Sequence, residues 1–583
     1  MSDRRRGGGG LRAAQDTAAA LARLAVRRIG AEWRSTAIYS GGLNRPRPAG
    51  LAIAPKDFRP LDPETGRQLL LGRITLAGMT LEIGPGGDPW DVASPSRAFA
   101  VELHRFAWLP GLLAQHQVGA EEALRLVLDW ERMFGRVTPF IWGAETLERR
   151  VFNLACGVRA LTERASEVEA AGLLALLARQ TRHLLKLDGG PHRRAERAAV
   201  AATVATALSG KAGEALRRAA LPKLIQALAA AVLPDGGLRT RSPEQALELL
   251  FDLLTLDDAL LQRGRDAPVA VSNAIDRLTD AVRFFTLGDG RLAAFQGGEA
   301  VDARRIAAAV AHHDGEGRVL SVLPHTGYHR LAGRTLLALV DAAPPAEGPW
   351  SLDACAQPLA MEITCGGDRL IANTGWSADA QGPAALRLTP GGTTASLGDG
   401  SAGRVLSGVL ARGLGPRLVG GARTVEVERQ EVEAGLLLEL SHDGWAQSLG
   451  LLHERRLFLD PRHDELRGED RFEPAADARA PGRRAAAYAV RFHLPPEVQV
   501  SLARDRRSVL LRGPSNRGWW FRNDAPDVML ESSIHFETHA ARRAAQIVLK
   551  GPLDPGALTR VRWKLTPVEP TDPRAPAPAQ APR

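Results

Sequence analysis

Apolar residues recur at helical spacing from about residue 95 to residue 315. Amphipathic stretches of about 12 to 20 residues alternate with short breaks, as in GAEEALRLVLDWERMFG at 119–135. The other stretches of this kind span 97–117, 144–163, 169–187, 193–208, 213–233, 242–264 and 272–288. A series of such helices, rich in Ala and Leu, predicts an all-α domain built from paired antiparallel helices.

The periodicity changes near residue 316, where short alternating runs begin, separated by Gly, Pro and other turn residues. LAMEIT at 359–364 and GWWFRN at 518–523 have the alternation of half-buried strands. Further runs of this type span 369–374, 424–444, 455–460, 487–494, 507–513, 544–551 and 559–568. Because so many short antiparallel strands need two packed sheets, this half is predicted to be a β-sandwich.

These patterns divide the chain into four parts. An N-terminal arm and helix span 1–35, a helical domain spans 36–315 and a β domain spans 316–568. The Pro/Ala-rich tail EPTDPRAPAPAQAPR at 569–583 is expected to be disordered. A length of 583 residues agrees with two large domains, because it exceeds what one hydrophobic core usually supports.

The charge pattern gives no indication of a nucleic-acid partner. The formal net charge is +9, and Lys and Arg are interspersed with Asp and Glu, as in RHDELRGEDRFEP at 462–474. A nucleic-acid-binding protein would instead gather its cations along one track, with aromatic residues between them. The excess charge therefore predicts a solvated surface with some affinity for polyanions.

The three cysteines, Cys156, Cys355 and Cys365, indicate neither a disulfide framework nor a metal site, because their number is odd and they lack zinc-type spacing. Cys355 and Cys365 could face each other across a hairpin.

The N-terminal sequence does not resemble a secretory signal. It begins MSDRRRGGGG, and arginines interrupt the helix that follows at 17–29. No run of about 18 apolar residues occurs that would span a membrane. A soluble cytoplasmic protein without a transmembrane segment is expected.

Six stretches carry a resemblance to a known family. They are ELHRFAWLPGLLA (102–114), LPDGGLRTRSPEQALELLFDLLTL (233–256), LPHTGYHRLAGRTLLALVDAAPP (323–345), PLAMEITCGGDRLIANTGW (358–376), the run at 441–472 and the run at 489–522. In order and spacing the chain resembles the heparinase II/III family of polysaccharide lyases, particularly its alphaproteobacterial type. The resemblance implies an incomplete (α/α) toroid followed by an antiparallel β-sandwich, with the substrate cleft between them.

The resemblance also implies a reaction and a partner. Such lyases cleave a uronate-containing glycan by β-elimination, in which a base removes the proton α to the carboxylate. The site needs cationic or amide groups that neutralise this carboxylate, and an acid–base pair, typically His and Tyr. The implied partner is an acidic polysaccharide or oligosaccharide, and no cofactor is implied.

The helical domain departs from the family pattern. Where relatives often have Gly-Asn-His, this chain keeps His192 but has Pro191 in place of the Asn. In the motif Asp-Gly-Gly-His, Leu238 replaces the histidine, although Arg241 is kept. Relatives then place a tyrosine just beyond the Pro, where this chain has Glu244 and Gln245, so the usual tyrosine base of the toroid is missing.

The β domain lacks the family's imidazoles as well. Asp353-Ala354-Cys355 occupies the position of the family's His-Ala-His, and Ala385 falls near another expected histidine. A zinc site needs three or four ligands. No metal site is therefore predicted.

The remaining candidates for catalysis are Tyr328, His325 and His192. The first two lie in PHTGYHR, where the domains should meet, so Tyr328 is a candidate acid–base with His325 or His192 as its partner. The alternative is a Tyr and a His packed into a turn. His192 is either a cleft base or a solvent-facing residue at a helix start.

The candidates for substrate binding are Arg241, Arg239, Asn153 and Arg150. Arg241 lies in a predicted loop, and loops over a toroid mouth are where ligands arrive. Arg239 lies in the same loop, whereas Asn153 and Arg150 lie on a predicted toroid helix.

Two functions follow. The first, and the leading one, is a heparinase II/III-like polysaccharide lyase with a degenerate active site, acting on an acidic glycan by β-elimination. The second is a catalytically silent carbohydrate-binding or cell-envelope accessory protein. The cytoplasm is the expected compartment, and family resemblance implies the periplasm or cell envelope as the alternative. The missing tyrosine and histidines favour the second function. If Tyr328 is buried away from a cleft, the lyase mechanism has no base.

Overall fold

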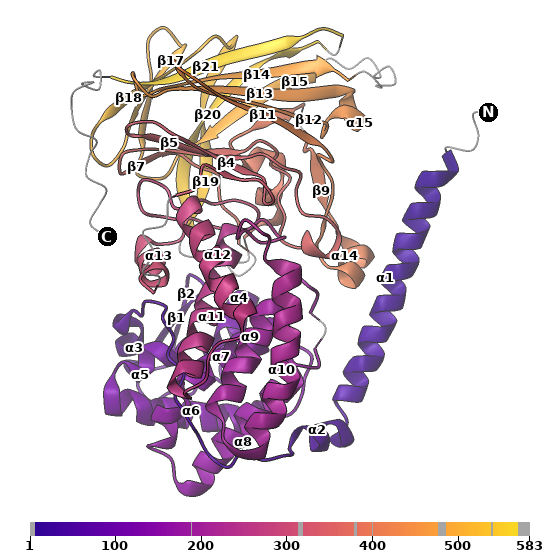
Figure 1. Cartoon of the computed structure of the whole chain (residues 1–583), viewed down its shortest axis with the longest axis vertical. Coiled ribbons are helices and arrows are strands. Elements are labelled where there is room, and N and C mark those ends of the chain that lie inside the picture. The colour runs from indigo at the N-terminus through magenta and orange to yellow at the C-terminus, as the bar shows by residue number, and fades with distance from the viewer. Residues whose placement is uncertain are drawn as a thin grey trace. The chain divides into compact units, whose positions relative to one another are not determined.

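The computed structural model describes residues 6–187, 189–312, 319–377, 382–398, 400–475, 486–537, 540–554 and 556–568, and side chains are described for these residues except 6–17 and 486. Contacts divide the chain into two units (Figure 1). The helical unit comprises the chain up to Val232, together with Glu248–Asp276 and Ser407–Gly415. The β unit comprises Leu233–Leu247, Arg277–Leu406 and the chain from Pro416 onward.

The helices found from 97 to 285 follow the predicted series closely. They are α4 (Arg97–His104), α5 (Leu109–Leu113), α6 (His116–Phe134), α7 (Ala144–Thr162), α8 (Glu167–Leu184), α9 (Arg194–Ala207), α10 (Gly210–Ala231), α11 (Pro243–Gln262) and α12 (Val269–Phe285). The remaining helices up to residue 312 are α1 (Arg6–Arg34), α2 (Ala37–Leu43), α3 (Pro63–Leu70) and α13 (Ala303–Val310). Local sequence sets some of the boundaries. A capping box begins α8, because the Ser166 hydroxyl accepts from the Glu169 N–H and the Glu169 carboxylate accepts from the Ser166 N–H.

The stretch predicted as one helix at 97–117 is broken into α4 and α5. Phe106 has a left-handed backbone, with φ of 58°, which ends the helical path after α4. The amide of Asn153, on α7, donates to the carbonyls of Arg105 and Phe106 at 3.0 and 3.3 Å. Phe106 is fully buried in the aromatic core of the helical unit. Burial of its ring and the two hydrogen bonds stabilise a break that apolar spacing does not reveal.

Two further features of the helical unit were not predicted. Strands β1 (Arg73–Leu76) and β2 (Met79–Glu82) form an antiparallel hairpin. Helix α14 (Gly408–Leu414) comes from the β half of the sequence but contacts α1. At their contact a Cβ on Gly413 would lie 2.6 Å from the carbonyl oxygen of Ala20, so only glycine fits.

The β unit contains three main antiparallel sheets. The strand orders are β3-β4-β5-β6-β7, β19-β20-β15-β8 and, in what we call the large sheet, β11-β12-β13-β14-β21-β18-β17-β16. The strands of the five-stranded sheet are β3 (Val322–Leu323), β4 (Tyr328–Ala332), β5 (Leu336–Asp341), β6 (Met361–Cys365) and β7 (Asp368–Ile371). The four-stranded sheet contains β8 (Ala395–Leu397), β15 (Ala486–His493), β19 (Asp527–Glu537) and β20 (Ala540–Leu553).

The large sheet contains β11 (Val425–Val432), β12 (Gly435–His442), β13 (Leu451–Asp460), β14 (Glu465–Pro474), β16 (Gln499–Leu502), β17 (Ser508–Arg512), β18 (Gly518–Asn523) and β21 (Thr559–Pro567). A small ladder of β9 (Gly403–Val405) and β10 (Leu418–Gly420) and the short helix α15 (Ala446–Leu449) complete the unit's α-helices and strands. One core of buried residues is shared by strands of all three main sheets, from Leu331 to Leu565.

This architecture confirms the predicted fold class, a helical domain followed by an antiparallel β domain. Most predicted strands are present, and β18 coincides with GWWFRN at 518–523. Within the described residues, no helix has the length and hydropathy of a membrane span.

Candidate active site

Arg241 lies in the loop that precedes α11 and has a left-handed backbone, with φ of 64°. A non-glycine residue in this conformation is strained unless its surroundings fix it. Interactions of the Arg241 side chain hold the backbone in this conformation. The side chain is 6% exposed, and its guanidinium is 2.6 Å from a carboxylate oxygen of Asp341. Burial disfavours the charge of Arg241, but Asp341 outweighs that effect and raises the pKa of the guanidinium.

All five N–H groups of Arg241 have acceptors inside the β unit. The acceptors are the carbonyl oxygens of Thr326, Gly327, Ala343 and Pro344 and the carboxylate of Asp341, at 2.6–3.1 Å. A guanidinium has five N–H groups and no more, so this side chain has no donor left for a substrate carboxylate. Arg241 therefore joins its own loop to strands of the β unit.

Tyr328, at the start of β4, is the residue that Arg241 covers. Its ring is fully buried, lies 4.8 Å from the Arg241 guanidinium and contacts the rings of Phe285 and Phe295. The Tyr328 hydroxyl donates to the Arg241 carbonyl at 2.8 Å. Burial raises the pKa of this hydroxyl well above its ordinary value. The acid–base role of Tyr328 stays a prediction, and the burial of its hydroxyl argues against it.

His325 lies on the same turn but is exposed. Its backbone N–H, like that of Thr326, donates to a carboxylate oxygen of Asp235 at 2.7 Å. The other oxygen of Asp235 accepts from the Thr326 hydroxyl at 2.7 Å. Asp235, from the Asp-Gly-Gly stretch, thus caps the turn that carries His325. The alternative that we considered for Tyr328 and His325, a Tyr and a His in a structural turn, describes these contacts better than an acid–base pair does.

The other predicted catalytic residue, His192, belongs to the helical unit and is half-buried in the turn before α9. Arg150, in the same unit, is fully buried. Its guanidinium donates to the Gln180 side chain and to the carbonyls of His104 and Ile141 at 2.8–3.1 Å. Burial lowers the pKa of Arg150 to about 9.

Arg150 lies 4.4 Å from the centre of the Trp130 ring. It therefore packs in the aromatic core of the helical unit, a position that argues against substrate binding. The same holds for Asn153, whose amide supports the break between α4 and α5. Among the predicted substrate-binding residues, Arg239 alone is exposed, with its guanidinium 5.7 Å from the Trp350 ring.

Of the residues that replace the family's imidazoles, Leu238 and Cys355 are buried, Asp353 is half-buried and Ala385 is exposed. Leu238 is 4% exposed. The Cys355 N–H donates to Gln296, and burial raises the pKa of the thiol to about 11, which leaves little reactive thiolate. Asp353 accepts from the Gln245 amide at 2.9 Å.

All three cysteines are free thiols, so Cys355 and Cys365 form no disulfide. Within the described residues, no group of three or more His, Cys, Asp or Glu side chains is arranged to hold a metal ion.

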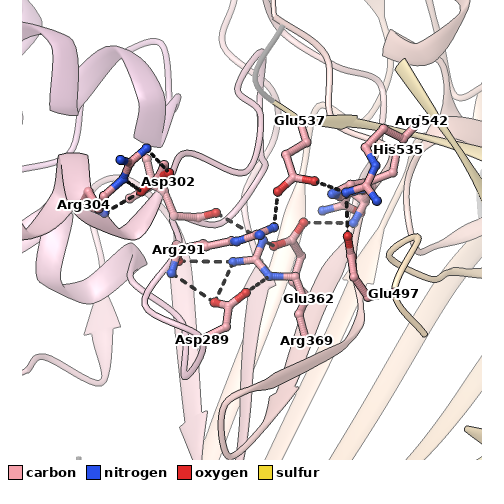
Figure 2. A network of polar contacts seen from close by, with 12 residues as sticks. Asp289, Arg291, Asp302, Arg304, Glu362, Arg369, Glu497, His535, Glu537 and Arg542 are labelled. Atoms are coloured by element: carbon pink, nitrogen blue, oxygen red, sulfur yellow. Dashed lines mark hydrogen bonds and ion pairs between the residues drawn. The ribbon is translucent and has the colours of Figure 1, made fainter. Parts of the chain in front are cut away.

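A second network in the β unit centres on Arg369 (Figure 2). Arg369, on β7, donates to both oxygens of Asp289 at 2.9 and 3.0 Å and to Glu362 at 3.1 Å. Its remaining N–H groups donate to two backbone carbonyls, those of Arg291 and Leu292. Like Arg241, this guanidinium has no donor left for a ligand.

Glu362, on β6, is fully buried beside Arg369. Burial, opposed by Arg369, raises its pKa to about 7. Nearby, burial lowers the pKa of His535 to about 4, and its ring nitrogen is 3.2 Å from the Asn373 carbonyl oxygen. A second chain of ion pairs in Figure 2 joins Arg291, Glu537, Arg542 and Glu497. These contacts connect the β6–β7 hairpin to the segment after α12.

Sequence reasoning missed Asp341, Glu362 and Asp289 as the partners of the two buried arginines. A signal for two of them is present. Asp341 ends the apolar run LLALVD, and Glu362 interrupts the apolar run LAMEIT. A charged residue in a buried strand requires a partner.

The two units together define a class of protein: a helical toroid-like part followed by an antiparallel β domain, the architecture of polysaccharide lyases. A family model described as heparinase II/III-like, C-terminal, matches residues 316–564. A relative from Caulobacter vibrioides, named FtsZ-localized protein C, is 53% identical over 541 residues, which are 92% of this chain and 94% of that protein. The chain belongs to the heparinase II/III-like family.

Solved structures agree with this fold. Heparinase III matches with a TM-score of 0.66 at 13% identity, over 87% of this chain and 85% of that one. A mutant of heparan sulfate lyase HepC from Pedobacter heparinus matches with a TM-score of 0.54 at 14% identity, over 91% and 87%. At these identities the likeness extends to the fold alone.

Proposed function

We propose that this chain is a catalytically silent member of the heparinase II/III-like family, an accessory protein that binds an acidic glycan and localises with FtsZ. The observation that carries the loss of catalysis is the pairing of Arg241 with Tyr328. The one guanidinium kept from the family motif has all its N–H groups bonded within the protein, and the Tyr328 hydroxyl is buried beneath it.

The chemistry of β-elimination explains why this pairing matters. The proton α to a carboxylate becomes acidic only when a cation or donor neutralises the carboxylate, and a base must then reach that proton. Arg241 has no donor for the first task, and Tyr328 has no access for the second. His325 is exposed. However, an imidazole cannot remove the weakly acidic α proton at a useful rate unless another group neutralises the substrate carboxylate.

Localisation with FtsZ rests on the relative from Caulobacter vibrioides, because 53% identity over nearly the whole of both chains supports a shared role. We propose the cytoplasm as the compartment. Three free cysteines, two of them buried, fit a reducing environment. An acidic glycan as the partner rests on the family, since one of the matching solved structures is named a heparan sulfate lyase.

The proposal is tested in Caulobacter vibrioides by replacing FtsZ-localized protein C with a fluorescent fusion of this chain, alongside a differently coloured FtsZ. We expect the two signals to coincide. A Tyr328→Phe fusion is the matched control and should localise equally well, because the proposed role does not use the hydroxyl. Diffuse fluorescence from a full-length, stable fusion would overturn the FtsZ part of the proposal.

A further inference from the structure

The outer face of the large sheet carries an unusual row of charges. Along β14 and β21 the buried residues, such as Leu466 and Val561, alternate with exposed polar ones, so one face meets the core and the other meets solvent. On the outer face Arg467 lies directly opposite Lys564, and Lys564 lies directly opposite Arg522 on β18. We call these three residues the cationic row.

Like charges in direct cross-strand register destabilise a sheet. The neighbouring row on the same face avoids this, because Arg456, Glu469 and Arg562 alternate in sign across three adjacent strands. The cationic row has no such alternation. Arg471 also lies opposite Arg560, but Glu454 lies opposite Arg471 on its other side, whereas the cationic row contains no acidic member. Such a row costs stability, and an anionic ligand would compensate the cost.

A single carboxylate serves most of the cationic row. Glu465 lies within ion-pair distance of both Arg467 and Lys564, the latter at 3.6 Å. Arg522 bonds the hydroxyl of Thr566 at 3.2 Å and has no carboxylate within ion-pair distance among the described residues. Two cations of the row therefore share one carboxylate, and the third, Arg522, has none within ion-pair distance among the described residues.

The cationic row also lines a pocket. The pocket has a volume of about 500 Å³, and its other lining residues include Leu437, Phe458 and Arg562. Aromatic rings support both ends of the row, because the Arg467 guanidinium lies 5.8 Å from the Phe458 ring and that of Arg522 lies 5.3 Å from the Trp520 ring. Such contacts hold a guanidinium in place and so reduce the conformational entropy that the side chain loses on binding a ligand.

The position of the pocket excludes one mode of peptide binding. Its strands β13, β14, β21 and β18 are interior strands of the large sheet, paired on both sides (Figure 1). An extended peptide therefore cannot add to them as a further strand, and recognition must use side chains. The three cations of the row come from adjacent strands, whose backbones lie about 4.8 Å apart.

From this geometry we propose that the outer face of the large sheet binds an acidic oligosaccharide, with its carboxylate or sulfate groups on Arg467, Lys564 and Arg522. Phe458 and Leu437 provide an apolar surface against which a sugar ring packs, and Asn523 and Asp524 in the same pocket offer partners for hydroxyl groups. The inference rests on the glycan-binding part of the proposed function and assigns that part to a site.

The test is calorimetric titration of the full-length protein with a size-defined heparin oligosaccharide at physiological salt. Lys564→Gln/Arg522→Gln should weaken binding by about tenfold or more, because two charge-assisted contacts are lost. The matched control, Arg512→Gln/Arg560→Gln, removes the same charge from exposed residues of the same sheet that do not line the pocket, and should stay within about twofold of wild type. Unchanged thermal unfolding of both variants verifies that they are folded.

Equal binding by wild type and both variants would overturn the site, while glycan binding as such would stand. The absence of heparin binding by the wild type would overturn both the site and the proposal that the protein binds an acidic glycan. Localisation with FtsZ is tested independently by the fluorescent fusion. A single-stranded DNA that binds as tightly as the oligosaccharide, and loses affinity equally in the pocket variant, would also contradict the proposal, because the pocket would then recognise polyanions in general.

Discussion

Replacing Arg241 by methionine separates a structural role from a substrate-binding role. Arg241→Met leaves the carboxylate of Asp341, which is 1% exposed, with the Gln296 amide at 2.7 Å but no cation. Breaking a buried ion pair in this way costs about 3–5 kcal/mol, a large share of a typical unfolding free energy of about 5–15 kcal/mol. Four backbone carbonyls lose a donor as well, although that of Gly327 keeps the N–H of Ala342.

Urea unfolding followed by tryptophan fluorescence measures this loss. The midpoint of the transition that reports on the β unit should fall by roughly 1 M or more. Arg241→Met/Asp341→Asn should recover part of the loss, because no buried charge remains unpaired. Arg239→Gln, an exposed change in the same loop, should alter the unfolding free energy by less than about 0.5 kcal/mol. If Arg241→Met unfolds like wild type but loses affinity for an acidic glycan, Arg241 is a substrate ligand and the structural account is wrong.

Three further outcomes are expected. Tyr328→Phe should lower the unfolding free energy by about 1–2 kcal/mol, through loss of one buried hydrogen bond, as measured by urea unfolding; an unchanged midpoint would contradict the contact. The pKa of Glu362 is raised from 4.5 to about 7 on folding, so its contribution is fully present below pH 4.5 and is lost as the pH rises through 7. Glu362→Gln should therefore flatten the fall in the free energy of unfolding between pH 5 and 8, by up to roughly 3 kcal/mol as measured by urea unfolding, and an unchanged slope would refute the raised pKa. Burial raises the pKa of Cys156, Cys355 and Cys365, so a thiol reagent should modify the native protein slowly and all three cysteines rapidly in denaturant; a rapid native reaction at Cys355 would show an accessible thiolate.

The periodic parts of the fold were predictable from the sequence. Residues 119–135 and 144–163 became α6 and α7 within a few positions, and GWWFRN became β18, because burial of a regular apolar face determines these elements. The break at Phe106 was not predictable in this way. It depends on two hydrogen bonds from Asn153, which is far away in the sequence. The spacing of apolar residues does not predict such hydrogen bonds.

The candidate site was predictable in some of its residues but not in their roles, and Arg150 and Asn153 belong instead to the core of the helical unit. PHTGYHR and the Asp-Gly-Gly loop do come together, with Asp235 capping the turn of His325 and Arg241 covering Tyr328. Whether Arg241 contacts a ligand or its own chain depends on where Asp341 and four carbonyls lie, and those contacts span 85 residues or more. The cationic row was also hidden, because Arg467, Lys564 and Arg522 become neighbours only through strand register.

The measurement that tests the central claim most directly is a search for the unsaturated product of β-elimination. Purified protein is incubated with a panel of uronate-containing polymers, and the absorbance of the new double bond is recorded, with heparinase III as the positive control. A lyase fold in which the Arg241 guanidinium is fully bonded within the protein and the Tyr328 hydroxyl is buried should give no absorbance on any polymer. Steady product formation on any polymer would contradict the account, and its loss in Tyr328→Phe would show that the buried hydroxyl reaches a substrate.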